Sequence, residues 1–369
     1  MSPLVERADR LAALAREREI DLLLVSEPLN LRWLTGFTGS NGLAVLGTAH
    51  SGPQGLFITD FRYVGQVAEQ VPPLWDRREA SLELLGPALS EHMPEWAGEG
   101  RPRVGFDERH VTVAQLGRVR EAIGERCELA PAGGLVEELR EVKDAGEVSR
   151  IREAAHLADR ALGEVLERGL AGRTEAEVAL DLEIAMRRHG AEALAFPPIV
   201  ASGEHGALPH AEPRAIVIEP GVLVTIDWGA RLEGYCSDCT RTYAVGEPGD
   251  LEREVYAVVL RAQEAALAAI RPGLEGREVD AVAREVIERA GYGKHFGHGL
   301  GHGVGLAVHE GPRLSRHGEQ PLMAGMVVTD EPGIYLPGRC GVRIEDLVVV
   351  TEDGADVLST LPKGLQVVD

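Results

Sequence analysis

The sequence has few cysteines and no long apolar run. Four cysteines are too few for a disulfide scaffold in a chain of 369 residues: Cys127, Cys236, Cys239 and Cys340. No stretch approaches the ~18 apolar residues that would predict a membrane span. The N-terminal segment also lacks the basic start and long apolar run of a signal peptide. We therefore expect a cytoplasmic protein with no membrane partner.

Basic residues are scarce as well. The chain has 38 Lys and Arg residues against 59 Asp and Glu residues, which gives a formal net charge of −21. Because nucleic acids and anionic membranes attract positive surfaces, this balance argues against either as a partner. An apolar content of 44% and a charged content of 26% are ordinary for a globular protein, and the length allows two domains.

Helix and strand patterns in the N-terminal third predict a mixed α/β domain over residues 1–133. We expect strands at residues 21–26, 42–47, 55–60 and 104–108, and helices at residues 5–19, 61–71 and 111–123. This domain carries no cluster of metal-ligating residues. A Pro- and Gly-punctuated stretch at residues 130–134 ends it, and residues 134–369 are expected to form the second domain.

The second domain begins with a helix signal. Asp144 with Glu147 three residues later is a capping box, which predicts the start of a long helix. The apolar residues that follow share one face of that helix: Ile151, Ala154, Ala155, Ala158, Leu162, Val165 and Leu166.

An internal repeat organises the rest of this domain. At an offset of 104 residues, GLAGRTEAEVA (169–179) falls on GLEGREVDAVA (273–283). In the same register, GVLVTIDWGARLEGYC (221–236) falls on GMVVTDEPGIYLPGRC (325–340), so that Asp227 aligns with Glu331. Each half reads as helices followed by a strand pair, which predicts an antiparallel sheet backed by helices. Two such halves facing each other would form a cleft lined by equivalent strand positions.

Four acidic residues lie on these repeated strand pairs. Asp227 and Glu331 end apolar strands, whereas Asp238 and Glu345 lie in the return strands. A single acidic residue near a strand end is usually a solvent-exposed residue without a specific role. Four acids directed at one cleft would raise one another's pKa unless cations neutralised them, which argues for a metal site.

Three histidines occur within a glycine-rich segment, FGHGLGHGVGLAVHE (296–310): His298, His302 and His309. The interleaved glycines disfavour a helix and allow the backbone to approach a ligand or another strand closely. His309–Glu310 begins like the helical zinc-protease motif H-E-x-x-H, but position 313 is Arg, so that motif is absent. A single histidine is usually structural, whereas three in this setting favour a site.

Carboxylate oxygens with one imidazole suit Mn²⁺, or Co²⁺ and Fe²⁺, better than a structural zinc site with thiolate ligands. Four carboxylates also suit two ions that share ligands. Such a pair can activate water and polarise a carbonyl, which is hydrolytic chemistry.

These residues resemble the pita-bread metallopeptidases, specifically the Xaa-Pro peptidases, prolidase and aminopeptidase P. HGLGHGVGLAVHE is similar to their histidine signature, and the spacing of the five metal ligands is reproduced: Asp227, Asp238, His302, Glu331 and Glu345. NLRWLTGFTGSNG and LFITDFRYVGQ resemble their creatinase-like N-terminal domain. The resemblance implies an α/β (α+β) chain with a creatinase-like domain (1–133) and a pseudo-symmetric pita-bread catalytic domain (134–369), and homodimers are usual in this family.

The resemblance also implies roles for individual residues. Asp227 would bind one of two divalent ions, for which Mn²⁺ is the leading candidate and Co²⁺, Fe²⁺ and Zn²⁺ are alternatives. His302 and Glu331 would bind the other, and Asp238 and Glu345 would bridge them. Glu331 would in addition act as the general base.

Four further residues match functional positions of the family. His210 would support the leaving imino nitrogen, although a loop-packing role is the alternative. His309 would stabilise the oxyanion, His298 would lie near the proline pocket, and Arg343 would orient the metal ligands.

Two residues depart from the family pattern. Strand alternation predicts that Asp330, beside Glu331, points away from the metals. Trp228, beside Asp227, is bulkier than the residue expected at this position of the family and is expected to shape the pocket.

The leading hypothesis is hydrolysis of the bond before a trans proline, which general peptidases cleave poorly because proline lacks an N–H and has a fixed φ. We favour a dipeptidase, in which an arginine would bind the free proline carboxylate, and Arg32 is a speculative candidate. Aminopeptidase P, acting on longer peptides, is the alternative. Methionine aminopeptidase is disfavoured by the N-terminal domain, and a non-catalytic binding module is disfavoured by the intact ligand set.

The C-x-x-C of GYCSDCTRT could instead indicate a thiol redox site or half of a zinc site. On an extended strand, however, Cys236 and Cys239 would point to opposite faces with Cα atoms about 10 Å apart, too far for a disulfide. Cys236 aligns with Cys340 in the repeat, whereas Cys239 has no cysteine mate. We therefore interpret the cysteines as packing residues and Asp238 as the functional residue.

Overall fold

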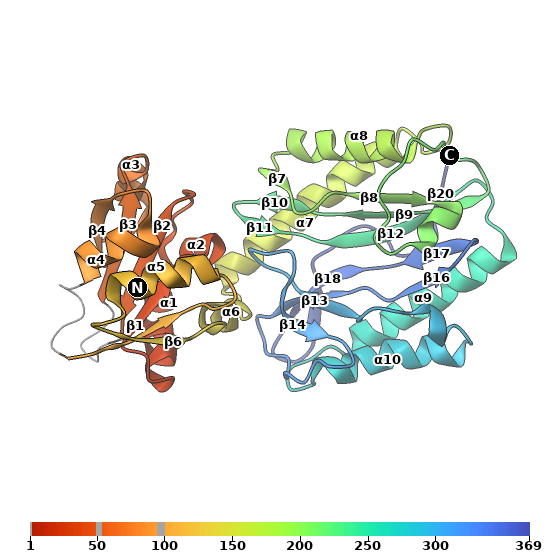
Figure 1. Cartoon of the computed structure of the whole chain (residues 1–369). Coiled ribbons are helices and arrows are strands. Elements are labelled where there is room, and N and C mark those ends of the chain that lie inside the picture. The colour runs from red at the N-terminus through yellow and green to blue at the C-terminus, as the bar shows by residue number, and fades with distance from the viewer. Residues whose placement is uncertain (1, 49–53, 94–99) are drawn as a thin grey trace. The chain divides into compact units, whose positions relative to one another are not determined.

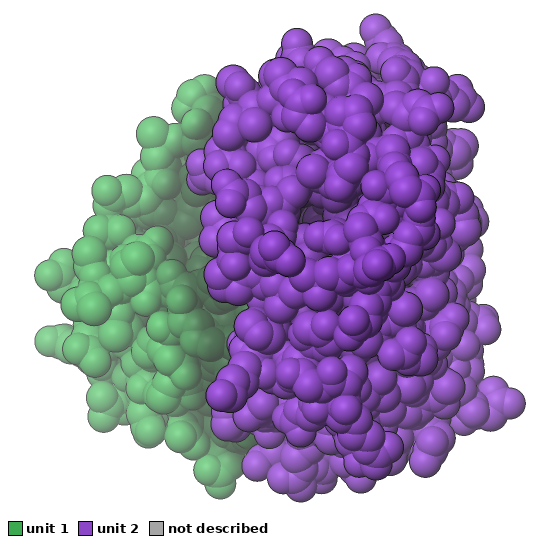
Figure 2. Space-filling view, turned by 90° about the vertical axis from the view of Figure 1, so that its right-hand side faces the viewer, with its two compact units in different colours: residues 1–140 green, residues 141–369 purple. Residues whose placement is uncertain are grey.

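The computed structural model describes residues 2–48, 54–93 and 100–369, and within these ranges the chain divides into two compact units, residues 1–140 and 141–369 (Figures 1 and 2). Helix α6 (Leu135–Arg140) belongs to the first unit, where Arg140 Nη1 donates a hydrogen bond of 2.7 Å to Asn30 Oδ1.

The first unit is built on a mixed sheet with the strand order β4-β3-β2-β1-β5-β6. Its strands are β1 (Leu22–Val25), β2 (Gly42–Gly47), β3 (Gln54–Asp60), β4 (Trp75–Ala80), β5 (Arg103–Phe106) and β6 (Glu128–Pro131). Its other helices are α1 (Pro3–Glu17), α2 (Pro28–Thr35), α3 (Val64–Gln70), α4 (Leu89–His92) and α5 (Val113–Ile123), with a helical turn at Leu84–Ala88. Every strand and helix predicted for this region is present, so the mixed α/β expectation is confirmed.

The second unit consists of two similar halves. The first half contains α7 (Ala145–Leu166), α8 (Glu175–Arg188) and a sheet of β8 (Ile199–Ser202), β9 (Val222–Trp228), β12 (Cys239–Val245) and β20 (Val367–Val368). The second half contains α9 (Asp250–Ala269), α10 (Gly276–Arg289) and a sheet of β13 (Gly301–Gly303), β14 (Glu310–Leu314), β15 (Val327–Asp330), β18 (Asp346–Val350) and β19 (Ala355–Val357). Short strands complete the unit: β7 (Ala193–Leu194), β10 (Ala230–Leu232), β11 (Tyr235–Cys236), β16 (Gly333–Leu336) and β17 (Cys340–Arg343).

The two halves pack as the repeat predicts. In Figure 1 the strands lie between two helix layers, with α7 and α8 on one side and α9 and α10 on the other. Each half has its own buried apolar cluster, one around Leu162, Val178 and Ile226 and the other around Val259, Val279 and Val328. The antiparallel pairs β9–β12 and β15–β18 are the repeated strand pairs.

The capping box that opens α7 is present. Asp144 Oδ1 accepts a hydrogen bond from the Glu147 backbone N–H at 2.9 Å, and Glu147 Oε2 accepts from the Asp144 N–H at 3.0 Å. The helix face predicted for burial is buried at Ile151, Ala154 and Leu162, because it packs onto the sheet of the first half. The local sequence therefore determines both the start and the orientation of α7.

Residues 359–369 return to the first half and pack beside its sheet. β20 pairs in parallel with β12, with Val367 opposite Ala244, and Lys363 Nζ lies 2.8 Å from Asp346 Oδ2. Among the described residues, no helix is both long enough and apolar enough to cross a bilayer.

Replacing Asp144 by Ala should lower the free energy of unfolding by about 1 kcal/mol, because the substitution removes the acceptor for an N–H at the start of α7. Denaturant unfolding followed by far-ultraviolet circular dichroism measures this change. Asp144→Asn is the matched control, because asparagine caps helices about as well as aspartate, and equal losses in both variants would contradict the capping role.

Candidate metal centre and active site

A cavity of about 570 Å³ opens in the second unit. Every site residue predicted for residues 134–369 lines it: His210, Asp227, Asp238, His298, His302, His309, Glu331, Arg343 and Glu345. Arg32 lies partly buried on α2 of the first unit, and its role stays a prediction.

The repeated strand pairs position the four acids. Asp227 lies in β9 and Asp238 immediately precedes β12, whereas Glu331 immediately follows β15 and Glu345 immediately precedes β18. The Glu345 backbone N–H donates to Thr240 O at 3.0 Å, which joins the two halves at the cavity. Equivalent ends of the repeated strands therefore meet, as the sequence predicts.

Glycines allow the histidine strand to fit beside its neighbours. A Cβ at Gly301 would lie 2.0 Å from Thr329 O, and one at Gly303 would lie 1.9 Å from Gly311 O. Neither position can accept a side chain without backbone movement, so these glycines bring His302 into the cavity.

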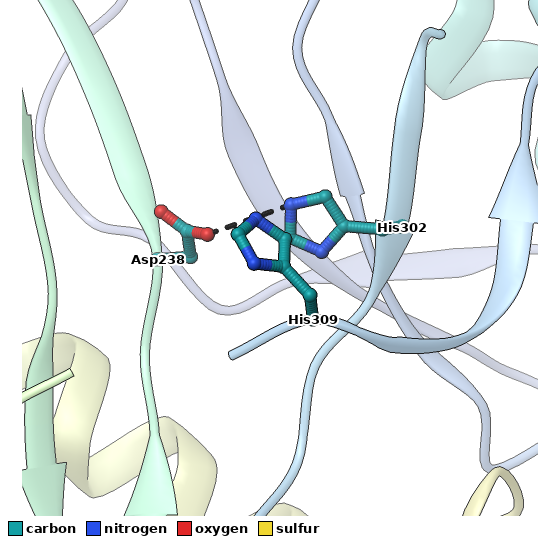
Figure 3. Close-up of side chains that lie close together, drawn as sticks. All are labelled: Asp238, His302 and His309. Atoms are coloured by element: carbon teal, nitrogen blue, oxygen red, sulfur yellow. Dashed lines mark ion pairs between the residues drawn. The ribbon is translucent and has the colours of Figure 1, made fainter. Parts of the chain in front are cut away.

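The ligand atoms of these residues lie close together in two groups that share Asp238. Oxygens of Asp227, Asp238 and Glu345 lie within 4.8 Å of one another, as do ligand atoms of Asp238, His302 and His309 (Figure 3). His302 Nε2 is 3.6 Å from Asp238 Oδ2 and 3.3 Å from Glu331 Oε1. Both groups could hold a metal ion.

Burial and mutual repulsion raise the pKa of most of these carboxyl groups. Burial raises the pKa of Asp238 well above its usual range, and the charges of Glu345 and Asp227 raise it further. The pKa of Glu345 is raised in the same way. Burial also raises the pKa of Glu331, but the hydrogen bond and charge of His302 outweigh that effect and lower the pKa to about 2. Ionising all the acids together therefore requires additional positive charge.

The donor set fits divalent cations. Asp227 Oδ1 and Glu345 Oε1 are buried and accept no hydrogen bond within the described part of the chain. A buried carboxylate oxygen without a partner is costly, and a cation would supply that partner. Oxygen ligands with one imidazole match the preferences of Mn²⁺ and related ions.

Arg343 is linked to two of the carboxylates by hydrogen bonds, and the orienting role stays a prediction. Its Nη2 donates to Asp227 Oδ2 at 2.7 Å, and its Nε donates to Thr240 Oγ1 at 2.9 Å. Thr240 Oγ1 donates in turn to Glu345 Oε2 at 2.7 Å. One guanidinium thus fixes acids from both halves.

The three remaining histidines surround the acids. His298 Nε2 lies 2.9 Å from the Tyr335 hydroxyl, and burial lowers the pKa of His298. Burial and the neighbouring His302 lower the pKa of His309 to about 4, so His309 is neutral at pH 7. His210 is exposed at the cavity.

Glu310, next to His309, is fixed by a buried ion pair. Its Oε1 lies 2.9 Å from Lys143 Nζ, and the side chains of Lys143 and Glu310 are only 1% and 6% exposed. This pair anchors the backbone that carries His309.

Strand alternation correctly predicts the position of Asp330. Its Oδ2 accepts a hydrogen bond of 3.0 Å from Gln263 Nε2 on α9, on the face of the sheet away from the cavity. The expectation that Trp228 shapes the pocket is wrong. Trp228 is fully buried in the apolar cluster of the first half, because the residue after Asp227 points to the opposite face of β9.

The cysteines, all within the described residues, form no disulfide. All four are free and buried, and Cys239 Sγ lies 3.3 Å from Glu345 O. Burial raises the pKa of the Cys239 thiol well above its usual value, so the thiolate is suppressed. The interpretation of the C-x-x-C as packing residues is confirmed.

Several cavity residues have no distinct sequence signal. Arg313 on β14 is exposed at the cavity, where Phe196, Pro197 and Pro198 provide an apolar wall. An isolated arginine or a Phe-Pro-Pro stretch in one sequence indicates no function by itself, so the sequence alone did not predict these residues.

The expectation of no metal-ligating cluster in the first unit is wrong, because among its described residues Asp107, His110 and Glu137 form such a group. Arg109 already neutralises it, with its guanidinium 3.2 Å from Asp107 Oδ1 and 2.8 Å from Glu137 Oε2. A bound cation would have to displace that arginine, so this group is a weak candidate.

Comparisons with known proteins agree for both units. The family model for metallopeptidase family M24 matches residues 149–352, and the model for the creatinase/prolidase N-terminal domain matches residues 7–142. The uncharacterized peptidase YqhT of Bacillus subtilis is 42% identical over 97% of this chain and 99% of its own.

Solved structures are similar over nearly the whole chain. An Xaa-Pro dipeptidase from Bacillus anthracis is 40% identical, with a TM-score of 0.93 over 99% of this chain and 100% of the other. An X-Pro aminopeptidase from Thermotoga maritima is 38% identical, with a TM-score of 0.88 over 96% of this chain and 100% of the other.

Replacing Thr240 by Val should weaken Mn²⁺ binding roughly 10- to 100-fold, because Glu345 and Arg343 lose the hydroxyl that links them. Isothermal titration calorimetry on the metal-free protein measures the affinity. Thr225→Val is the matched control, because Thr225 is buried in the neighbouring strand β9 but bonds to Thr242 and Gly341 instead of a carboxylate. Equal affinity in wild type and Thr240→Val would contradict the orienting role.

Proposed function

Because this chain belongs to metallopeptidase family M24, we propose that it is a metal-dependent Xaa-Pro dipeptidase that hydrolyses the bond before a trans proline. The observation that carries the proposal is that four carboxylates on or beside the repeated strand pairs line a single cavity together with His302. The similarity to a whole chain described as an Xaa-Pro dipeptidase supports the substrate class.

We propose two divalent ions as the cofactor, with Mn²⁺ as the leading candidate. Asp227 would hold one ion, and His302 and Glu331 would hold the other. Asp238 and Glu345 would contribute to the binding of both ions. Bound divalent ions supply Lewis acidity, which acidifies water and polarises the scissile carbonyl. The unpartnered oxygens of Asp227 and Glu345 support this assignment.

The remaining roles belong to side chains. Glu331, with Oε1 3.3 Å from His302 Nε2, would accept the proton of the attacking water. Neutral His309 would donate its N–H to the oxyanion, and His210 would donate to the leaving imino nitrogen. His298, held by Tyr335, would form one side of the proline pocket.

The chain length of the substrate depends on what binds its carboxylate. Arg313 is exposed at the cavity, and a guanidinium pairs well with a free carboxylate, so we propose Arg313 for this role. Arg32, which the sequence suggested, stays a prediction. Aminopeptidase P activity on longer peptides is the second candidate function, favoured by the similarity to the Thermotoga maritima X-Pro aminopeptidase.

Methionine aminopeptidase activity and a purely binding role have less support. Methionine aminopeptidase is disfavoured by the match of residues 7–142 to the creatinase/prolidase N-terminal domain. A binding module without catalysis is disfavoured by the complete ligand set in the cavity. The homodimer and the cytoplasmic location expected from the sequence stay predictions.

Hydrolysis of Ala-Pro and Ala-Pro-Ala, each with Mn²⁺ and after chelation, tests the proposal. We expect faster turnover of the dipeptide and no turnover of either peptide after chelation, because the carboxylates need the cations. Faster cleavage of the tripeptide would indicate aminopeptidase P instead. Turnover that survives complete metal removal would contradict metal dependence.

Replacing Arg313 by Met should raise the KM for Ala-Pro about 10- to 100-fold, because one charge-assisted hydrogen bond contributes roughly 1.5–3 kcal/mol. The same variant should hydrolyse Ala-Pro amide, which has no carboxylate, as the wild type does. Steady-state kinetics with both substrates measures the difference. Arg32→Met is the matched control. A larger increase in KM for Ala-Pro in Arg32→Met than in Arg313→Met would assign the binding of the substrate carboxylate to Arg32.

A further inference from the structure

His210 has no side-chain partner that fixes its position within the described residues. It is exposed at the cavity and makes no side-chain hydrogen bond to that part of the chain. It belongs to the segment 203–213, which runs from the end of β8 to Arg214. The position of its imidazole therefore depends on how the backbone of this segment is anchored.

Glu175, the first residue of α8, is fully buried and binds both ends of this segment. Its Oε1 accepts hydrogen bonds of 2.8 Å from the Ser202 backbone N–H and from Ser202 Oγ. Its Oε2 accepts a hydrogen bond of 3.0 Å from the Arg214 backbone N–H. One carboxylate thus connects the residue before the segment to the residue after it.

The same carboxylate also holds a residue inside the segment. His205, itself buried, lies with Nδ1 2.9 Å from Glu175 Oε2, and because a carboxylate can only accept, Nδ1 carries the hydrogen. The backbone of α8 adds a further bond, from the Ala176 N–H to Arg214 O at 3.1 Å. Both backbone groups of Arg214 are therefore bound to the first turn of α8.

An ionised acid suits this position better than a neutral residue. Burial raises the pKa of Glu175, but the hydrogen bonds from Ser202 and Arg214 and the charge of His205 outweigh that effect and lower it. These neighbours all present donors to the carboxylate. Glutamine would have nearly the same volume but would present an NH₂ group to one of those donors.

We propose that Glu175 is a positioning residue for catalysis, which clamps segment 203–213 so that His210 faces the scissile bond. The inference rests on the proposed function for the role of His210, whereas the clamp itself is a property of the chain without substrate. Glu175 does not line the cavity, so it acts through the segment and not on the substrate.

The repeat-related helix α10 holds a second histidine segment in a comparable way. Asp280 Oδ1 accepts a hydrogen bond of 3.0 Å from the Leu300 backbone N–H, and Arg284 Nη2 donates to His298 O at 2.9 Å. Asp280 and Arg284 also pair with each other, 2.7 Å apart, and both are buried. Charged residues of both repeated helices thus fix the backbone beside a cavity histidine.

Glu175→Gln tests the clamp, and Glu177→Gln is the matched control. Glu177 lies in the same helical turn but is exposed, and glutamine preserves its capping box with Thr174. Hydrogen–deuterium exchange of the metal-free, substrate-free protein should show at least about tenfold faster exchange across residues 203–214 in Glu175→Gln alone. Mn²⁺ affinity should be the same in both variants and the wild type.

Kinetics on Ala-Pro connect the clamp to His210. Glu175→Gln should lower kcat roughly 10²-fold with little change in KM, because a misplacement of about 1 Å costs that much. In a His210→Ala background, Glu175→Gln should cause no further loss of kcat, since the two residues act on one step. Additive losses in this double-mutant cycle would overturn the positioning role.

Ser202→Ala provides a milder variant if Glu175→Gln folds poorly. It removes a single hydrogen bond, so faster exchange confined to the same segment is expected. Unchanged exchange in both folded variants would overturn the clamp even if the enzyme hydrolyses Ala-Pro. If the wild type fails to hydrolyse Xaa-Pro peptides, the proposed function fails, and the exchange experiment still decides whether the clamp exists.

Discussion

Asp227, Asp238 and Glu345 repel one another, because their oxygens lie within 4.8 Å of one another and their side chains are largely withdrawn from solvent. The first half of the repeat supplies Asp227 and Asp238, which already repel each other, and the second half adds Glu345. Arg343 offsets part of this repulsion through Asp227. Divalent ions held by the unpartnered oxygens of Asp227 and Glu345 would offset the rest, and metal binding would then be coupled to folding.

The cavity combines two kinds of support. The acids lie on or beside strands whose register is fixed by long antiparallel pairing, such as that of β9 with β12. The histidines other than His302 lie on irregular segments, which buried charges on helices or beside them hold in place. Glu175 binds the segment that carries His210. Asp280 and Arg284 bind the segment that carries His298. The Lys143–Glu310 ion pair anchors the segment that carries His309. Paired strands therefore position the candidate metal ligands, while loops anchored by buried charges position the other three cavity histidines.

The sequence predicted features that depend on local or repeated patterns. The capping box at Asp144 and the alignment of Asp227 with Glu331 are visible in the chain itself, and both describe the structure correctly. Residues whose role depends on tertiary neighbours were missed. Glu175 at a helix start is indistinguishable from an ordinary first-turn acid, and Arg313 is one arginine among many until the fold brings it to the cavity. The prediction for Trp228 was wrong because successive side chains of a strand point to opposite faces, so the residue after Asp227 points away from the cavity.

The pairing of β20 with β12 has a consequence for the timing of assembly. β12 directly follows Asp238, yet its outer edge meets Val367 and Val368, which are synthesised long after it. Lys363, which pairs with Asp346 in addition to Arg241, is equally late. A nascent chain that already contains all five candidate metal ligands therefore still has an open strand edge. Residues 363–368 must therefore be synthesised before the strand pairing of the ligand-bearing sheet is complete, which is later than the synthesis of Glu345, the last candidate metal ligand.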